Sequence, residues 1–311
     1  MLPLLLLLVP FSSVCAAFGR SYHEVTGGVS IRWASLAPLP GSSISTGMGF
    51  GGGAGYIYHF NDRISVRTGL NFNRYSGASF IEKRNETSTV IIPEEWLWLG
   101  DKFFELRSHI SGYSVRHSAL YVQAPLLFGY EAEMPWAEWL SWYVSGGVEL
   151  GYSLTGKSSA RIDTLSMNGF FDYEGYPMED VKQLLGFGSY LGEQPQAALN
   201  LGFSAIGYLE VGLKQRLAEH YSIYIGIFGE YSLYSAVAGG IHPRIYEYEA
   251  QHPSSGSYYK LRYTPASHVA GISSKTSYPM AFGVTIRFSF DTMREKPVNR
   301  RMLQMHYLDF I

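Results

Sequence analysis

Hydrophobic and polar residues alternate along eight segments of the chain. Period-2 alternation is the pattern of a β-strand with one apolar and one polar face. The segments are residues 22–36, 44–60, 64–75, 119–131, 141–157, 200–216, 221–234 and 278–290. In the last one, Phe282, Val284 and Ile286 share one face. Each segment is long enough to cross a bilayer as a tilted strand, which takes roughly 9 to 11 residues.

The connections between these segments alternate between short and long. Only residues 61–63 separate the second and third segments, whereas 76–118, 158–199 and 235–277 are each about 40 residues long. Compact soluble domains rarely contain several loops of that length, but outer-membrane barrels combine short periplasmic turns with long extracellular loops. The sequence therefore predicts an all-β fold: an eight-stranded antiparallel up-and-down transmembrane β-barrel with short periplasmic turns and three long extracellular loops.

Composition narrows the class of protein. The chain is 46% hydrophobic, 15% aromatic and only 16% charged, below the roughly 25% charged residues of an ordinary soluble domain. The net charge of −2 provides no basic field for nucleic acid. A soluble all-β protein remains the alternative to a membrane barrel, but faces rich in Gly, Ser and single charges suit a narrow lumen better than open solvent.

The N-terminus has the features of a secretory signal peptide. An apolar run from Leu2 to Phe11 precedes the small residues Ser12, Ser13, Ala16 and Ala17. We predict a signal peptide at 1–17, an outer-membrane barrel at 18–290 and a periplasmic C-terminal tail at 291–311. Cleavage after Ala16 or Ala17 removes Cys15, which is the only cysteine, so disulfide and thiol chemistry are not expected in the mature chain. Lipidation of Cys15 is the less favoured alternative.

Charged side chains on the polar faces predict a network inside the barrel. An eight-stranded barrel has an interior only wide enough for side chains, and an unpaired charge there costs several kcal/mol. We therefore predict a plugged lumen. A narrow porin-like channel, conducting protons or ions along the same residues, is the alternative. The predicted lumen network comprises Arg32, Arg67, Gln123, Glu149, Glu210, Lys214, Glu230 and Arg287.

Glycines and tryptophans refine this picture. Gly49, Gly51, Gly53 and Gly55 share the inward face of the second segment, where missing side chains leave room for long neighbours such as Arg67 or permit sharp curvature. Tryptophans gather at the turn before the fifth segment and suggest an aromatic girdle at the periplasmic interface, with a soluble core role as the alternative. These tryptophans are Trp136, Trp139 and Trp142.

No cofactor or metal site is predicted. The nine histidines are scattered, and none pairs with another at ligand spacing. In the second long connection, Val181, Leu184 and Leu185 have helical spacing, which predicts a short amphipathic helix on the barrel rim.

Three segments carry a family resemblance. Met48–Tyr56, followed by Phe60–Leu70, resembles the first short-turn hairpin of the PorT-type, OmpA-like outer-membrane β-barrel proteins of Bacteroidota. Tyr121–Leu127 is similar to a Tyr-x-x-x-Pro-Leu-Leu strand of that group, and Gly283-x-x-Ile286-x-Phe288 to a closing signal strand. That signal strand normally ends the chain, whereas here a basic tail follows.

The resemblance implies a location and partners. It implies the outer membrane of a Gram-negative bacterium, insertion by the barrel-assembly machinery, and contact with outer-membrane lipid and lipopolysaccharide. For some members it also implies an envelope or secretion partner.

Two functions of different classes follow from these features. The first is a non-enzymatic barrel whose surface loops bind a ligand, shield the surface or serve an envelope or secretion role. The second is a lipid-modifying enzyme, because His109 and Ser111 share a strand face as a base and nucleophile would, with Glu105 as an orienting group. That pair resembles the His-x-Ser of lipid A deacylases, but Gly112 replaces the Asn that usually follows.

Overall fold

The computed structural model describes residues 22–35, 43–92, 103–171, 177–178, 181–198, 201–218, 220–237, 244–251, 258–264 and 280–291. The expected signal peptide at 1–17, with Cys15, and the tail beyond Asp291 lie outside these ranges. The expected domain boundaries therefore stay predictions.

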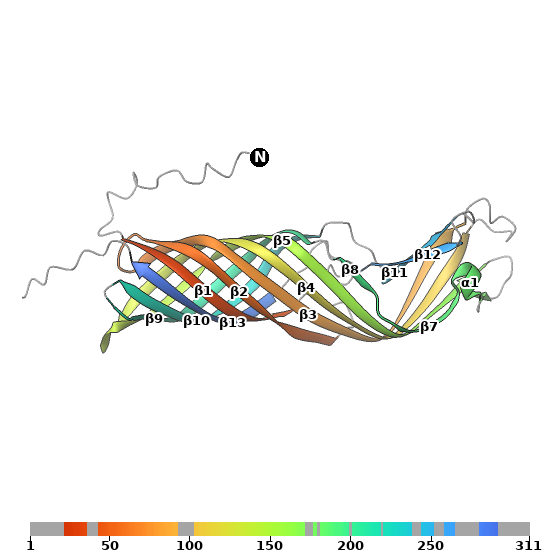
Figure 1. Cartoon of the computed structure of the whole chain (residues 1–311), viewed down its shortest axis with the longest axis horizontal. Helices are drawn as coiled ribbons and strands as arrows, with labels where there is room; N and C mark the ends of the chain where they lie inside the picture. Colours follow the sequence, from red (N-terminus) through yellow and green to blue (C-terminus); the bar gives the residue numbers. More distant parts are fainter. Residues whose placement is uncertain are drawn as a thin grey trace, which may run out of the picture.

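Eight strands form a closed antiparallel ring (Figure 1). They are β1 (Tyr22–Ser35), β2 (Ser43–His59), β3 (Ile64–Ile91), β4 (Phe103–Met134), β5 (Ala137–Phe170), β9 (Leu201–Arg216), β10 (Tyr221–Val237) and β13 (Met280–Asp291). Among these eight, each strand pairs with the next one along the chain, and β1 pairs with β13 to close the ring. The predicted eight-stranded up-and-down barrel is confirmed.

The barrel wall carries its apolar side chains on the outside. Along β13 burial alternates strictly: Phe282 and Phe288 are about 60% exposed, whereas Arg287 is buried. In water this outer face would be a large apolar patch, but in a bilayer the acyl chains cover it. The pattern is that of a transmembrane barrel and not of a soluble one, which buries its apolar face.

Short connections close one end of the barrel, here called the turn end. At the β2–β3 turn, the Asn61 side chain accepts hydrogen bonds of 2.8 Å from the backbone N–H groups of both Arg63 and Ile64. Residues 135–136 and 217–220 make the other short connections at this end. An Asn in this role is the ordinary chemistry of a tight turn.

Beyond the barrel, three strands continue into an extension. β3, β4 and β5 run past the row formed by Ala78, Arg116 and Ser159, far outside the ring in Figure 1. The other elements there are β6 (Pro177–Met178), α1 (Lys182–Leu185), β7 (Gly188–Glu193), β8 (Gln196–Ala198), β11 (Tyr246–Ala250) and β12 (Tyr259–Tyr263). β6, β7 and β8 pair with β5, while β11 and β12 form a separate hairpin. The described parts of all three long connections thus contain β-strands.

In the extension the two faces exchange character. On the barrel part of β4, Leu126 and Phe128 face outward and Gln123 is buried, but on the extension part Phe104 and Leu106 are buried and Arg107 is exposed. Water surrounds the extension, so its apolar residues turn inward. They form one cluster in which Phe104, Phe171 and Phe187 are in ring contact.

On all three strands the buried face changes between odd-numbered and even-numbered residues at one row of paired residues. The buried residues on β3 switch from odd positions up to Ile81 to even ones from Ser88, and β4 and β5 switch at Gly112 and Asp163. Gly112 has φ +64°, and a Cβ there would lie 2.2 Å from an Asp163 carboxylate oxygen. The strand pairing keeps the same register on both sides of this row. The switch explains why alternation did not extend the predicted strands into 76–118.

The predicted helix exists but lies elsewhere. α1 is a single turn at the far end of the extension (Figure 1), not on the barrel rim. Leu185 is buried in the aromatic cluster, whereas Leu184 is exposed. Within the described residues, no helix is long and apolar enough to span a membrane.

Candidate functional site: the charged lumen

Charged and aromatic side chains fill the barrel interior in layers. Nearest the turn end, Lys214 Nζ lies 2.6 Å from Glu24 and 3.0 Å from Glu131. Tyr224 donates its hydroxyl to the same two carboxylates, at 2.8 and 3.0 Å. His59 Nε2 lies 3.2 Å from Glu24. This layer therefore joins five strands: β1, β2, β4, β9 and β10.

The middle layer is centred on Glu210 of β9. Arg287 donates to both Glu210 carboxylate oxygens at 2.6 Å. Arg67, on β3, lies 3.2 Å from the same carboxylate. Tyr208 donates a 2.8 Å hydrogen bond and Tyr143 a further one. Glu210 is fully buried, so two cations and two hydroxyls replace the water that the carboxylate loses.

The third layer joins Arg32 of β1 to Glu230 of β10. Arg32 Nη1 lies 3.1 Å from Glu230 Oε1, and Nη2 donates to Asn73 at 2.7 Å. Tyr75 donates to Glu230 at 2.7 Å, and Gln123 is hydrogen-bonded to both Tyr75 and Asn73. The three layers thus place buried charged and aromatic side chains in the central lumen.

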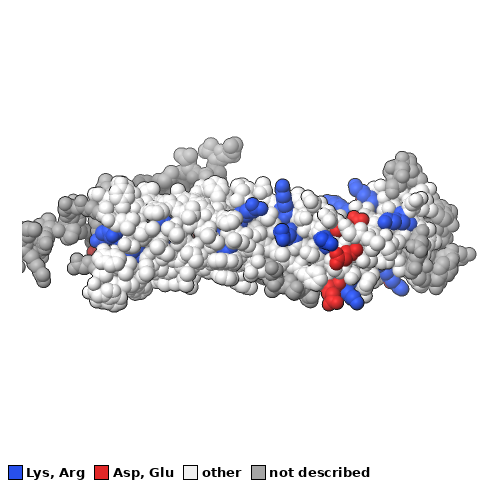
Figure 2. Space-filling model, turned by 60° about the horizontal axis from the view of Figure 1, so that its bottom comes forward, with Lys and Arg blue, Asp and Glu red and all other residues white. Residues whose placement is uncertain are grey.

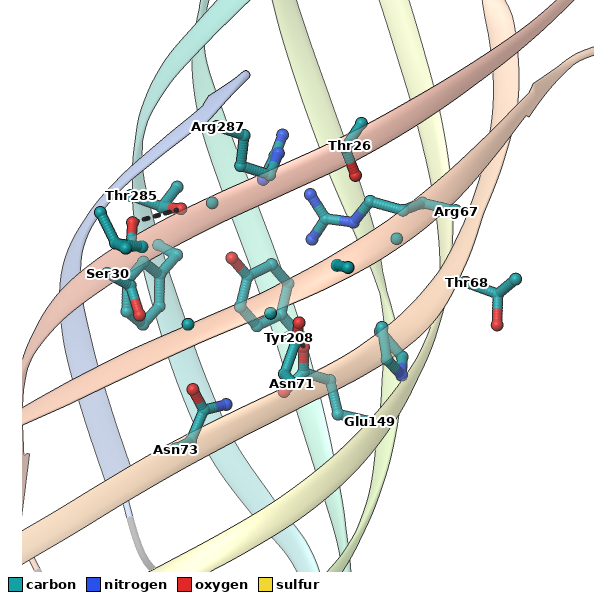
Figure 3. Close-up of a pocket in the computed structure, with 18 of the residues that line it drawn as sticks. Thr26, Ser30, Arg67, Thr68, Asn71, Asn73, Glu149, Tyr208, Thr285 and Arg287 are labelled. Carbon is teal, nitrogen blue, oxygen red and sulfur yellow. Dashed lines mark hydrogen bonds between the residues drawn. The ribbon is translucent and has the colours of Figure 1, made fainter. Parts of the chain in front are cut away.

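Glu149 differs from the other buried glutamates. Its contact is a 3.3 Å hydrogen bond from Asn71 to Oε1, and Oε2 is buried with no hydrogen-bond partner among the described residues. It lines a polar cavity of about 50 Å³ together with Arg67 and Arg287 (Figure 3). Because one water needs about 10–15 Å³, this cavity has room for a few waters and not for a larger solute.

The inward glycines of β2 make room for the first and third strands. A Cβ on Gly51 would lie 2.1 Å from Asn73 Oδ1 and 2.6 Å from Arg32 Nη2. A Cβ on Gly53 would lie 2.3 Å from Asn71 Oδ1. The expectation of space for a long neighbour therefore describes Arg32, whereas Arg67 is not among the nearest atoms at these positions.

All eight residues of the predicted lumen network point into the interior. Seven of them belong to the layers described above, and Glu149 lines the cavity. Sequence reasoning missed several of their partners. Glu24 and Arg32 have the same parity on β1, as have Gln123 and Glu131 on β4, so alternation extended to the strand ends would have found both glutamates. The other missed residues are His59, Asn71, Asn73, Tyr75, Tyr143, Tyr208 and Tyr224.

The candidate catalytic residues lie on the outside of the extension. His109 and Ser111 share the outer face of β4, but the imidazole is hydrogen-bonded to Asn85 and not to Ser111. Glu105 pairs with Arg107 at 2.6 Å. Leu120 lies on the barrel part of β4, and Ser111 lies nine residues farther out along the same strand. At about 3.3 Å per residue this is a distance of roughly 30 Å. The geometry therefore does not assemble these three residues into a catalytic group.

The three tryptophans lie at the turn end. Trp136, Trp139 and Trp142 are exposed on the outer wall at and after the β4–β5 turn, and Trp142 is in ring contact with Tyr130 at 5.6 Å. Tyr221 and Phe290, also in ring contact, face outward at the same end. For metals, no group of three or more His, Cys, Asp or Glu side chains within the described ranges is arranged to hold an ion.

No protein-family model and no curated protein sequence matches this chain. Solved barrel structures resemble it at low identity. The outer membrane protein OprG from Pseudomonas aeruginosa is 10% identical, with a TM-score of 0.33, over 90% of this chain and 99% of that one.

Two further structures are similar to the same extent. Neisserial surface protein A is 9% identical with a TM-score of 0.31, over 86% of this chain and 97% of that one. Ail, the attachment invasion locus protein of Yersinia pestis, is 10% identical with a TM-score of 0.27, over 86% and 99%. These likenesses concern the fold alone, and the assignment of a barrel stands on the closed strand order.

Proposed function

We propose that this chain is a non-enzymatic outer-membrane protein of a Gram-negative bacterium in which a closed barrel anchors a rigid surface extension. In this proposal the signal peptide directs export, the barrel-assembly machinery inserts the barrel, and the tail remains in the periplasm. A relationship to PorT-type proteins of Bacteroidota, and with it an envelope or secretion partner, belongs to the same proposal.

The observation that carries the proposal is the continuity of β3, β4 and β5. Each of these strands passes without interruption from the barrel wall into the extension, so the extension is held by the backbone hydrogen bonds of the same sheet. A large aromatic cluster then fixes the β11–β12 hairpin against it. Rigid display of a surface is the role that such an architecture supports.

The interior favours an anchor over the alternatives. The narrow-channel alternative needs a continuous water path, whereas Glu210 and Glu230 are each paired with cations inside the lumen. The lipid A deacylase-like alternative needs His109 and Ser111 in contact with each other and close to lipid. His109 is instead hydrogen-bonded to Asn85, and both residues lie on the extension. We therefore retain binding or shielding by the extension as the function.

Two measurements test the proposal. In planar bilayers the purified full chain is expected to give no stepwise conductance. In cells, residues 79–115 are replaced by a short turn joining Ala78 to Arg116, which are paired neighbours. The shortened barrel is expected to keep its mobility shift between boiled and unboiled gel samples but to lose surface-binding and fitness phenotypes. Stable channels, or phenotypes that survive the shortening, would contradict the proposal.

A further inference from the structure

Three cations form a basic band on one side of the extension, at its base. Arg74 on β3, Arg116 on β4 and Lys157 on β5 are all exposed on the outer face. The pairing places them on successive rows: Arg74 is opposite Leu120, Lys157 opposite Ser118, and Arg116 opposite Ser159. Neighbouring strands are about 4.8 Å apart and successive rows about 7 Å, so the three cations lie within roughly 15 Å of each other.

The band lies at the boundary of the lipid-facing wall. Immediately toward the barrel, the outer face of the same strands is apolar and exposed at Phe72, Tyr152 and Leu154. Figure 2 shows few charged side chains over the barrel wall, then Lys and Arg gathering near the middle of the molecule, and a group of acidic residues farther out on the extension. The cations therefore stand at the level where acyl chains give way to headgroups.

The cations of this band are not neutralised within the described part of the protein. The ion pairs of the extension involve Arg84, Arg107 and Arg161, and none of them includes Arg74, Arg116 or Lys157. On β3, β4 and β5, the acidic residues of the extension are Glu82, Glu86, Glu105 and Asp163, and all lie farther from the barrel than Arg116. Ser118 and Ser159, which lie between the cations, add hydroxyl donors, whereas the Ser76 hydroxyl donates to the backbone carbonyl of Met48.

From this juxtaposition we infer that the outer face of β3–β4–β5 binds the phosphorylated headgroup of a glycolipid in the outer leaflet. Phosphates pair with Arg74, Arg116 and Lys157, sugar hydroxyls meet the serines, and the acyl chains lie on Phe72, Tyr152 and Leu154. The apolar rows and the cations follow one another in the order of the parts of such a lipid. The inference rests on the outer-membrane location proposed above.

The test measures binding of lipid A to the purified full-length chain in detergent by native mass spectrometry. Three ligands are compared: bisphosphorylated lipid A, the same lipid with both phosphates removed, and phosphatidylglycerol as a generic anionic lipid. R116Q is compared with R107Q, a matched control on the same face of β4 whose arginine pairs with Glu105. A triple variant, R74Q/R116Q/K157Q, removes the band.

We expect R116Q to weaken binding of bisphosphorylated lipid A on the order of fivefold, which corresponds to about 1 kcal/mol per cation near an anionic surface. The triple variant loses on the order of 100-fold, and R107Q binds like the unmodified chain. Removal of the phosphates weakens binding to the level of the triple variant.

Three outcomes would overturn the inference: unchanged binding by the triple variant, equal binding of the dephosphorylated lipid, or equally tight and equally band-dependent binding of phosphatidylglycerol. The gel shift of each variant checks that the barrel is intact. Failure of the proposed function appears separately, as conductance or as phenotypes that survive shortening of the extension.

Discussion

Arg32 and Glu230, 198 residues apart in the chain, form a buried ion pair of 3.1 Å inside the barrel lumen. The two strands that carry them, β1 and β10, are separated in the wall by β13, so the ion pair passes over β13 on the lumen side. It joins two strands that backbone hydrogen bonds do not join directly. The charged interior thus ties together strands that are not neighbours in the ring.

Removing one partner of this pair is expected to destabilise the barrel. R32Q or E230Q leaves the other charge buried and uncompensated, which costs about 3–5 kcal/mol. The temperature at which the unboiled gel form is lost measures the effect. The double variant R32L/E230L is expected to be more stable than either single variant, and a double variant with the summed loss would contradict the pairing.

Glu149 is expected to be dispensable for stability. E149Q removes a buried carboxylate that has only one hydrogen bond of 3.3 Å, so it changes stability by about 0–1 kcal/mol and in the favourable direction. The matched comparison is E210Q, which leaves Arg67 and Arg287 facing each other without their shared carboxylate and costs about 3–5 kcal/mol. The same gel assay ranks the two, and equal losses would show that the lumen charges are not paired as described.

Glycine at position 51 is expected to be required by the lumen network. A methyl group in G51A collides with Asn73 and Arg32, and overpacking of this kind costs about 1–3 kcal/mol. G229A is the control, because a Cβ there has no heavy atom within 4 Å and a change within about 0.5 kcal/mol is expected. Urea titration of the folded barrel measures both. A tolerated G51A would mean that the interior can rearrange.

A change in the aromatic cluster is expected to loosen the extension while the barrel stays intact. Phe104 is buried and contacts the rings of Phe171 and Phe187 at 5.0 and 5.4 Å, so F104A costs about 3–5 kcal/mol within that cluster. Limited proteolysis should then cleave the extension faster while the gel shift of the barrel persists. A simultaneous loss of the gel shift would show that the two parts fold as one unit.

Alkaline pH is expected to release the β11–β12 hairpin. Burial raises the pKa of Tyr246, Tyr248 and Tyr263 above the ordinary tyrosine value. A raised pKa in the folded state means that the contribution to stability is complete below the unfolded value of about 10 and is lost as pH rises through the folded values. Tyrosinate absorbance and protease sensitivity of the hairpin should therefore increase together above about pH 10. Y248F should reduce the number of tyrosines that appear in this transition, and hairpin release at neutral pH would contradict the assignment.

The barrel was predictable because lipid and lumen impose opposite demands on successive residues. Alternation at Phe282, Val284 and Ile286 located β13 and its lipid-facing side from sequence alone. The extension was not predictable in the same way. Its faces are inverted by exposure to water, and the parity switches at Gly112 on β4, so no single period runs through 76–118.

The lumen shows the same division. Parity alone placed Arg32, Glu210 and Arg287 inside, because a strand offers only two faces. Which charge meets which depends on strand order, tilt and side-chain length around a closed ring. Glu210 thus takes both Arg67 and Arg287, while Glu149 has neither as a hydrogen-bond partner.

The sequence by itself determined the number of barrel strands, their lipid-facing sides and the inward face of the eight predicted lumen residues, since these properties are local and repeat with period 2. Only the tertiary structure decided the pairing of the charges, the role of Gly51 beside Arg32 and the ordered extension with its basic band. Those features arise where strands distant in sequence are brought together, and alternation along one strand carries no information about its opposite wall.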